Sequence, residues 1–289
     1  MNLDLLVSAL VLGSIYALIT VGYVVVFRAS GIFNFLHPDL MLIGALTYTT
    51  FAGTDNGVGF SVAVVVSVLA VSVLGGLIYV ASVDRTSGMP HWIQMILTMG
   101  LSIAAVNAAQ LVWGGNLRHL TLPYPNTTVD LPGVRTTTTD LIIVVVSVVL
   151  CTFLYWLLTR SSFAIGFRAA AENPVLAAYH GIQLRRWYGG AWALASGAAV
   201  VAGLAYSSKV PLDPSLVNVG LLAFPAALLG GMDSISGAFI GALVLALVQQ
   251  VAAVQFGTQS AVPLSYAVAL VVLMLRPQGL FGQRVLTRV

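Results

Sequence analysis

The best-defined group of residues that could do chemistry lies between positions 166 and 182, and its residue types suit packing against another surface rather than catalysis. Asn173 is a favourable N-cap residue, and Pro174 suits the first helical position because its missing N–H is not needed there. Gly181 suits the position after the last turn, where a left-handed backbone is common. The spacing therefore predicts a short helix between Asn173 and Gly181.

This predicted helix has an apolar side. Val175, Leu176 and Tyr179 are related by spacings of three and four residues, which place their side chains on one side of a helix. A simple connecting loop does not require a capped helix with an apolar side, whereas a partner with a hydrophobic groove would bind one. The same side could instead pack against the ends of the protein's other helices. The sequence leaves both interpretations open.

A second group consists of polar residues in or beside long apolar segments. His37 and Asp39 begin a short apolar segment, and Asn107 and Gln110 lie on one face of a longer one. A polar side chain is costly in the hydrocarbon layer, so we expect each of them to face protein or water. These residues could line a transport pathway. The alternatives are hydrogen bonds between helices for Asn107 and Gln110, and a gate or cap role for His37 and Asp39.

Two further patterns involve proline and glycine. Pro225, next to Phe224, frees a backbone carbonyl inside an apolar segment, and broken segments of this kind often line substrate sites. Gly237 and Gly241 form a G-x-x-x-G pattern, which lets two helix backbones approach closely. The second pattern indicates helix packing, either within this chain or across a dimer.

The motifs of common enzyme sites are missing from the sequence. It contains no G-x-x-x-x-G-K-[ST] loop to hold ATP phosphates and no G-x-S-x-G nucleophile motif. The four histidines are far apart, and a single cysteine, Cys151, cannot form an internal disulfide or a cysteine-rich metal site. We therefore expect a protein that is not an enzyme and that itself binds no metal or cofactor.

The elements that must position these residues are membrane helices. Hydrophobic residues make up 59% of the 289 positions and charged residues only 7%, which leaves too little polar surface for a water-soluble fold. Eight apolar runs without β-type alternation suit spanning helices, and a ninth is short and interrupted by Pro225. The predicted fold is all-α, a single transmembrane domain at 1–289 that forms a polytopic bundle of about nine crossings, with eight as the alternative. The runs cover 5–27, 36–52, 60–82, 92–113, 141–159, 187–207, 236–254 and 262–275, and the ninth covers 217–231.

The arginines predict the orientation. Four of them lie in the loop 160–186 against one acid, which places this loop in the cytoplasm. Counting crossings outward from it places the N-terminus and the loops 53–59 and 114–139 outside. The prolines and the glycine at 123–133 and the threonine run at 136–139 predict that the loop 114–139 is irregular chain. With nine crossings, the tail that carries Arg276, Arg284 and Arg288 is cytoplasmic. The basic residues do not gather on one stripe, so we do not expect nucleic-acid binding.

Four segments resemble, in order, the permeases of branched-chain amino acid ABC importers, which are membrane subunits of type II importers. G-S-I-Y-A-L at 13–18 with N-F-L-H at 34–37 is similar to the opening motifs of the family. R-A-A-A-E-N-P-V-L-A-A-Y-H-G-I at 168–182 is similar to its coupling loop. G-G-M-D-S-I-S-G at 230–237 and R-P-Q-G-L-F-G at 276–282 resemble its late glycine signature and its terminal motif.

The resemblance implies a permease in a bacterial inner membrane that moves a small polar substrate, such as a branched-chain or other neutral amino acid, by alternating access. It also implies two ATPase subunits that bind ATP and Mg, an extracytoplasmic binding protein and a second permease, paralogous or identical. Coupling to the ATPase is then expected at Arg168, Glu172, Asn173, Pro174, Val175, Leu176, Tyr179 and Gly181. Pathway or gate roles are expected for Asn34, His37, Asp39, Asn107, Gln110, Phe224 and Pro225.

One departure from the family leaves the substrate open. His37 is followed by Pro38 and Asp39 where the family usually has Gly-Glu, so urea, short amides and aromatic acids are alternative substrates. The competing class of protein is an ion-coupled secondary transporter or a channel that acts without an ATPase. Such a protein requires carboxylates in the middle of the membrane, whereas the nine acids of this chain lie in loops or near helix ends.

Overall fold

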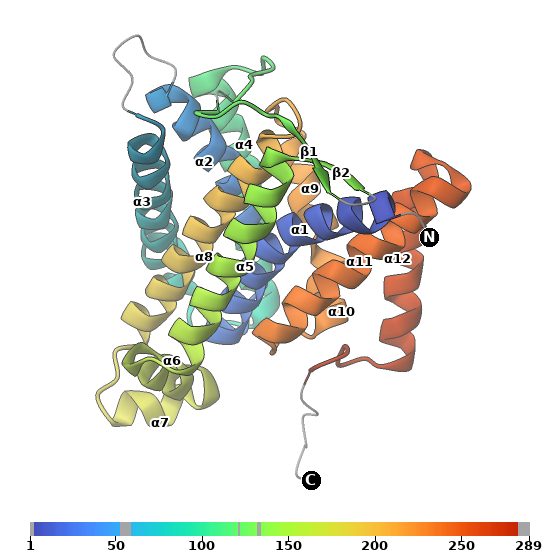
Figure 1. Cartoon of the computed structure of the whole chain (residues 1–289). Helices are drawn as coiled ribbons and strands as arrows, with labels where there is room; N and C mark the ends of the chain where they lie inside the picture. The colour runs from blue at the N-terminus through green and yellow to red at the C-terminus, as the bar shows by residue number, and fades with distance from the viewer. Residues whose placement is uncertain (1–2, 53–58, 121, 132–133, 283–289) are drawn as a thin grey trace. The chain divides into compact units, whose positions relative to one another are not determined.

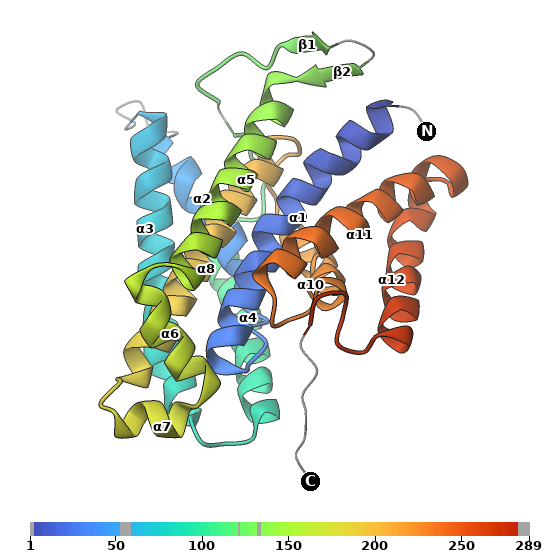
Figure 2. The same ribbon diagram turned by 60° about the horizontal axis from the view of Figure 1, so that its bottom comes forward.

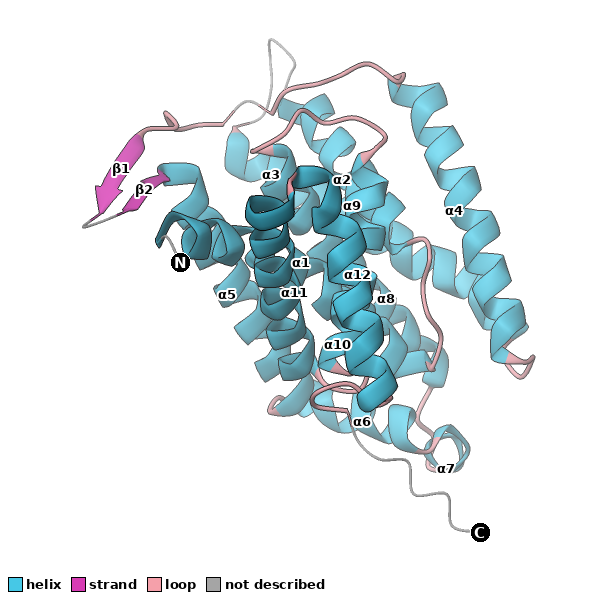
Figure 3. Cartoon of the chain, turned by 90° about the vertical axis from the view of Figure 1, so that its right-hand side faces the viewer, coloured by secondary structure: helices cyan, strands magenta, loops and turns pink. Residues whose placement is uncertain are grey.

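The computed structural model describes residues 3–52, 59–120, 122–131 and 134–282, and these residues are largely helical (Figures 1 and 3). Two tail arginines, Arg284 and Arg288, and most of the predicted loop 53–59 lie outside the described residues. The helices are α1 (Leu3–Ser30), α2 (His37–Ala52), α3 (Phe60–Ile78), the π-helical turn η1 (Tyr79–Val83), the 3₁₀ turn η2 (Asp84–Thr86), α4 (His91–Trp113), α5 (Thr138–Thr159), α6 (Ser162–Glu172), α7 (Pro174–Tyr179), α8 (Leu184–Ser207), α9 (Leu216–Leu222), α10 (Phe224–Gly230), α11 (Ile235–Phe256) and α12 (Thr258–Leu275).

Seven helices among the described residues are long and apolar enough to cross a membrane, which confirms the predicted polytopic all-α fold. Each coincides with one of the apolar runs predicted from the sequence. The two segments predicted to be short are α2, with 16 residues, and the stretch Leu216–Gly230. The latter is interrupted at Ala223, between α9 and α10. Pro225 explains the break, because it has no backbone N–H with which to continue the hydrogen bonding of α9.

The loop 114–139, predicted to be irregular, contains an antiparallel hairpin. Strand β1 (Thr128–Leu131) pairs with β2 (Val134–Thr137), so that Thr128 lies opposite Thr137. The prediction was wrong here because threonine and valine are β-branched and favour the extended backbone.

The chain forms two compact units, which we describe separately. The first unit consists of Met1–Val24, Asn126–Cys151 and Leu222–Val289, and the second of Val25–Pro125 and Thr152–Leu221. α1 and α5 therefore each contribute to both units.

Small residues bring α10 and α11 of the first unit into backbone contact. A Cβ atom added to Gly241 on α11 would collide with the carbonyl oxygen of Ala226 and lie 2.6 Å from the backbone nitrogen of Gly230. A Cβ atom on Gly237 would collide with the Gly230 carbonyl oxygen in the same way. The two glycines of the G-x-x-x-G pattern thus pack within this chain, where only a glycine leaves room for the neighbouring backbone.

Hydrogen bonds join the start of α1 to α11 within the first unit. The Thr20 hydroxyl donates to the carbonyl oxygen of Ala238 over 3.3 Å, and the Tyr16 hydroxyl donates to Gln249 Oε1 over 2.9 Å. The Thr20 hydroxyl also lies 3.1 Å from the Ala17 carbonyl oxygen of its own helix, whereas the Tyr16–Gln249 bond pairs two side chains that the hydrocarbon layer would leave unpaired.

In the second unit, α8 packs against both α2 and α3 (Figure 2). A Cβ atom on Gly75 of α3 would collide with Ser196 of α8, and one on Gly203 of α8 would lie 2.5 Å from the Met41 carbonyl oxygen of α2. α8 is therefore the central helix of this unit. Any displacement of α8 must be accommodated by both neighbours, because the backbones are in contact.

The loops of the second unit gather at its two ends as the topology prediction requires. At one end, the Arg118 N–H donates to the Leu212 carbonyl oxygen over 3.0 Å, and the Trp113 indole N–H donates to Thr50 Oγ1 over 2.7 Å. At the other end, one cavity is lined by residues from the end of α1, the α3–α4 connection and the loop 160–186. Connections separated by an even number of the predicted crossings therefore lie together.

Candidate functional site

The short helix predicted between Asn173 and Gly181 is α7, and its boundaries have the expected geometry. The Asn173 side-chain oxygen accepts a hydrogen bond from the Leu176 backbone N–H over 2.9 Å, and Pro174 occupies the first turn. At the other end Gly181 has φ of +78°, its N–H donates to the Ala178 carbonyl, and the Ile182 N–H donates to the Ala177 carbonyl. This pair of bonds is a Schellman motif, which ends the helix within one residue.

The apolar side of α7 faces away from the protein. Val175, Leu176 and Tyr179 are 66%, 53% and 86% exposed, whereas Ala177 on the opposite side is buried. The sequence left two interpretations open for these side chains: binding of a partner, or packing against the ends of the protein's other helices. In the described residues they do not pack in this second way, because all three are exposed. Three large apolar side chains held on a capped helix form a surface of the kind that binds partners. We call Val175, Leu176 and Tyr179 the α7 surface.

Contacts between α6 and α8 fix the position of this surface. The Phe163 ring lies 4.8 Å from the Trp187 ring, and the Tyr188 hydroxyl donates to the Ala170 carbonyl oxygen over 2.8 Å. Gly166 faces the Trp187 ring so closely that a Cβ atom would collide with it. These contacts join α6, and α7 after it, to the start of the central helix α8 (Figure 1).

The charged residues predicted to couple with a partner are also exposed. Arg168 lies on α6 and its side chain donates to the Ala164 carbonyl oxygen over 3.2 Å, while Glu172 ends α6 just before the cap. Nearby, the Arg185 guanidinium forms a 3.2 Å ion pair with Asp84, which ties the start of α8 to η2. Charged groups thus occur on the elements directly before and after α7, and charged groups are common at the rim of a protein interface.

The cap of α7 gives a first testable prediction. We expect Asn173→Ala to destabilise α7 by about 1 kcal/mol, since the Leu176 N–H loses the Asn173 side-chain oxygen that accepts its hydrogen bond. Hydrogen exchange of the Leu176 amide should then accelerate about fivefold. Asn173→Ser, which retains a capping oxygen, is the matched control and should exchange at nearly the native rate. Equal exchange in the alanine variant would contradict the assigned cap.

The predicted pathway residues at the start of α2 lie in a buried turn of the second unit. Asn34, His37 and Asp39 are 2%, 1% and 0% exposed. The Asn34 side-chain oxygen accepts from the Leu36 N–H over 3.0 Å, so Asn34 stabilises the turn that begins α2. The sequence offered a cap role for His37 and Asp39 but not for Asn34, so the cap role of Asn34 is a finding of the structure. A substrate role for His37 and Asp39 remains a prediction.

Two hydroxyl residues of α4 face this turn and were not identified from the sequence. The Phe35 N–H donates to Thr98 Oγ1 over 3.4 Å, and Ser102 lies close enough to the Asp39 carboxyl to interact with it. Thr98 and Ser102 are four residues apart, so they lie on the same face of α4. That spacing of hydroxyl groups in an apolar helix is the signal that could have identified them.

The other predicted pathway residues lie elsewhere. Asn107 and Gln110 are exposed on α4, and the Asn107 amide donates to the Ile103 carbonyl oxygen of its own helix over 2.7 Å. Phe224 and Pro225 belong to the first unit and begin α10, where the Phe224 ring lies 6.4 Å from the Tyr23 ring in an edge-to-face arrangement. Within the second unit, the predicted pathway residues therefore divide into the buried Asn34, His37 and Asp39 and the exposed Asn107 and Gln110.

Comparison with known proteins matches nearly the whole chain to one family. Residues 5–276 match the family model described as the permease component of branched-chain amino acid transport systems. The high-affinity branched-chain amino acid transport system permease protein BraD of Pseudomonas aeruginosa is 30% identical, with 97% of this chain and 96% of that protein covered. LivH of Escherichia coli K12, which has the same description, is 28% identical over 96% of this chain and 94% of LivH. The solved structure of PsaBC from Streptococcus pneumoniae in complex with Fab matches with a TM-score of 0.50 at 11% identity, covers 94% of this chain and 91% of its own, and supports the fold alone.

Proposed function

Because the chain belongs to the branched-chain amino acid transport permease family, a family of transport subunits, we propose that it is the membrane-spanning permease of an ATP-driven importer. The observation that carries this proposal is the exposed α7 surface. An importer of this kind needs a site on the permease at which separate ATPase subunits can transmit force, because this sequence has no nucleotide-binding loop of its own. The α7 surface is a preformed, apolar and sharply bounded site for such contact.

The proposed coupling route runs from α7 to the central helix of the second unit. A displacement of α7 would move α6, and the Phe163–Trp187 and Tyr188–Ala170 contacts would pass it to α8. α8 in turn contacts α2 and α3 through glycine positions that leave no free space. Nucleotide binding by the ATPases then favours one of two arrangements of these helices, which is the physical requirement of alternating access.

The proposed partners and orientation follow from this assignment. Two ATPase subunits supply ATP and Mg, which this chain does not bind, and a binding protein delivers the substrate on the opposite side of the membrane. A second permease, paralogous or identical, completes the pathway. The loop that carries α7 faces the cytoplasm, the N-terminus faces outward, and nine crossings return the tail to the cytoplasm.

The proposed substrate is a branched-chain or other neutral amino acid. The names of the relatives BraD and LivH support this class, whereas Pro38 and Asp39 depart from the sequence that the family usually has after His37. Asp39 is fully buried at the start of α2, so the departure changes the inside of the second unit and not its surface. Urea, short amides and aromatic acids are the alternative substrates to be compared with L-leucine.

Transport in vesicles separates this proposal from its competitor. We expect vesicles with the assembled complex to take up L-leucine only when ATP is supplied on the ATPase side and the binding protein is supplied on the opposite side. Vesicles that hold this chain alone should take up none under a proton or sodium gradient. Gradient-driven uptake by the chain alone would show that it is a secondary transporter or channel.

A further inference from the structure

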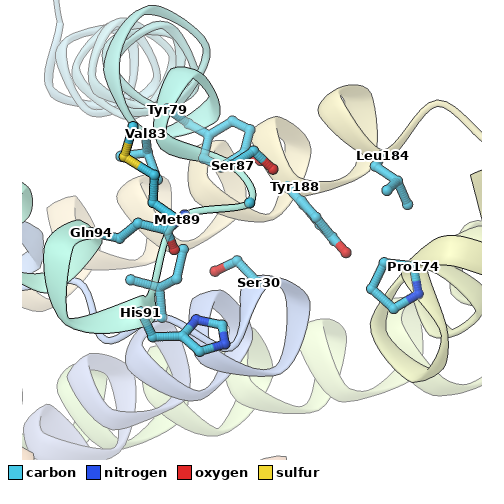
Figure 4. Close-up of a pocket in the computed structure, with 12 residues that line it drawn as sticks. Ser30, Tyr79, Val83, Ser87, Met89, His91, Gln94, Pro174, Leu184 and Tyr188 are labelled. Atoms are coloured by element: carbon cyan, nitrogen blue, oxygen red, sulfur yellow. The ribbon is translucent and has the colours of Figure 1, made fainter.

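A cavity in the second unit adjoins α7 and has no role in the coupling route described above. Its volume is about 360 Å³, which lies within the range of small-molecule sites. It opens between the start of α7 and α8 on one side and η1 with the start of α4 on the other (Figure 4). Pro174, the first residue of α7, forms part of its wall, so a bound molecule would touch the coupling helix directly.

One buried polar group of the cavity wall, the Gln94 side-chain amide, has an oxygen atom that lacks a hydrogen-bond partner. Gln94 on α4 is only 5% exposed, and its Nε2 donates to the Thr86 carbonyl oxygen over 2.8 Å. Because only the nitrogen can donate this bond, the orientation of the amide is fixed. Gln94 Oε1 has no hydrogen-bond partner, and the side chain lines the cavity. A buried acceptor without a partner is unfavourable, so a ligand that brings a donor would be stabilised there.

Two neighbouring hydroxyl groups also present acceptors. The Ser30 hydroxyl donates to the Val26 carbonyl oxygen over 2.9 Å, and the Tyr188 hydroxyl donates to the Ala170 carbonyl oxygen over 2.8 Å. Each hydroxyl has therefore used its proton and retains oxygen lone pairs for a ligand. Figure 4 shows Ser30 between Gln94 and Tyr188. Three acceptors around one space suit a group with several N–H donors, such as a primary ammonium.

The rest of the wall restricts the ligand further. None of the twelve lining residues is Asp, Glu, Lys or Arg, so the site offers no partner for a ligand with a net charge. Ile32, Val83 and Leu184 supply apolar surface, and the His91 ring and the Ser87 hydroxyl could contact a carboxylate. An apolar body, an ammonium and a compensating carboxylate together describe a neutral amino acid.

We propose that this cavity binds a neutral amino acid from the side of the membrane on which α7 lies, and that the bound molecule slows transport by tying Pro174 of α7 to α4. The inference rests on the proposed function, because it takes the transported class of molecule as the ligand. A ligand held by both α4 and the start of α7 favours the arrangement in which the cavity has this shape. It therefore opposes any displacement of α7 relative to α4.

The test measures ATP-driven uptake of L-leucine into vesicles whose lumen, on the ATPase side, is either empty of amino acids or preloaded with L-leucine. For each protein variant, uptake into preloaded vesicles is compared with uptake by the same variant into vesicles that hold no amino acid. We expect preloading with L-leucine to inhibit the native complex, and preloading with L-aspartate, which has a net charge, to have little effect. Uptake that is unchanged by luminal L-leucine would overturn the inference while leaving the proposed function intact.

Two substitutions, each with a matched control, locate the inhibition in the cavity. Met89→Trp, at a half-exposed lining position, fills the space and should remove inhibition, whereas Met99→Trp, equally exposed on α4 but outside the cavity, should retain it. Gln94→Leu should raise the half-inhibitory concentration about fivefold, the effect of one lost hydrogen bond. Gln94→Glu loses the bond to Thr86 but keeps an acceptor, so it should remain inhibited. Full inhibition of both Met89→Trp and Gln94→Leu would place the inhibitory site elsewhere.

A binding measurement decides the inference without depending on transport. The melting temperature of the purified native chain should rise with L-leucine concentration, and the rise should be smaller for Met89→Trp than for Met99→Trp. If vesicles take up no L-leucine at all, the proposed substrate is wrong. The melting temperature then remains as the only test of binding in the cavity. No rise in the native chain would overturn the inference.

Discussion

Changing Tyr179 to aspartate is expected to detach the ATPase subunits while the permease remains inserted in the membrane. Tyr179 is 86% exposed on α7, so the change costs the isolated chain little. At the proposed interface it removes a large aromatic anchor and introduces a charge without a partner. Loss of such an anchor typically weakens an interface by 2 kcal/mol or more, which corresponds to about a thirtyfold decrease in affinity. Val175→Asp, on the same surface, should have the same direction of effect.

Co-purification of the ATPase with the tagged permease measures this prediction directly. Leu117→Asp is the matched control, because Leu117 is also an exposed apolar residue, at 65%, but lies in the connection that follows α4, at the other end of the second unit. It should retain the ATPase at the native level. Native co-purification of both α7 variants, together with normal ATP-driven uptake, would remove the coupling assignment.

The largest expected effect on stability comes from Gly241→Val in the first unit. The side chain would have to occupy space already filled by the Ala226 carbonyl oxygen and the Gly230 backbone. Backbone atoms cannot move aside as a flexible side chain can, so the cost should reach or exceed the upper end of the 1–3 kcal/mol typical of overpacking. We expect little or no folded, monodisperse protein after extraction into detergent.

Gly100→Val is the control for this prediction. Gly100 also lies within a spanning helix, α4, but no atom would lie within 4 Å of an added Cβ atom there. The purified chain should therefore be recovered at nearly the native yield. Recovery of folded Gly241→Val at the yield of Gly100→Val would mean that α10 and α11 are not in backbone contact.

The features of this protein that could be predicted from sequence are those set by local chemistry. Asn173, Pro174 and Gly181 determine the start and end of α7 through their own backbone preferences, and the structure confirms these boundaries. The break before α10 likewise follows from the missing N–H of Pro225. Long apolar runs predict the spanning helices because the bilayer leaves backbone groups no other partner.

The features that could not be predicted depend on which segments meet in space. Whether Val175 and Tyr179 face outward is decided by the way α6 docks on α8 through Phe163 and Trp187, and these residues are ordinary aromatic residues in the sequence. The buried turn at Asn34 depends on Thr98 of α4, which is distant in sequence. The exposure of Asn107 could not be predicted from the sequence either. Helical spacing shows which residues share a face of a helix, but it does not show what that face contacts.

The central claim is that α7 contacts an ATPase, and photocrosslinking from position 179 tests it most directly. A photoreactive amino acid would replace Tyr179 in the full complex within native membranes, and illumination would be followed by identification of the adduct. We predict a covalent adduct between position 179 and an ATPase subunit, whose yield changes when ATP is bound. An adduct only with a protein on the external side, or the lack of any ATPase adduct in a complex that still transports, would contradict the account.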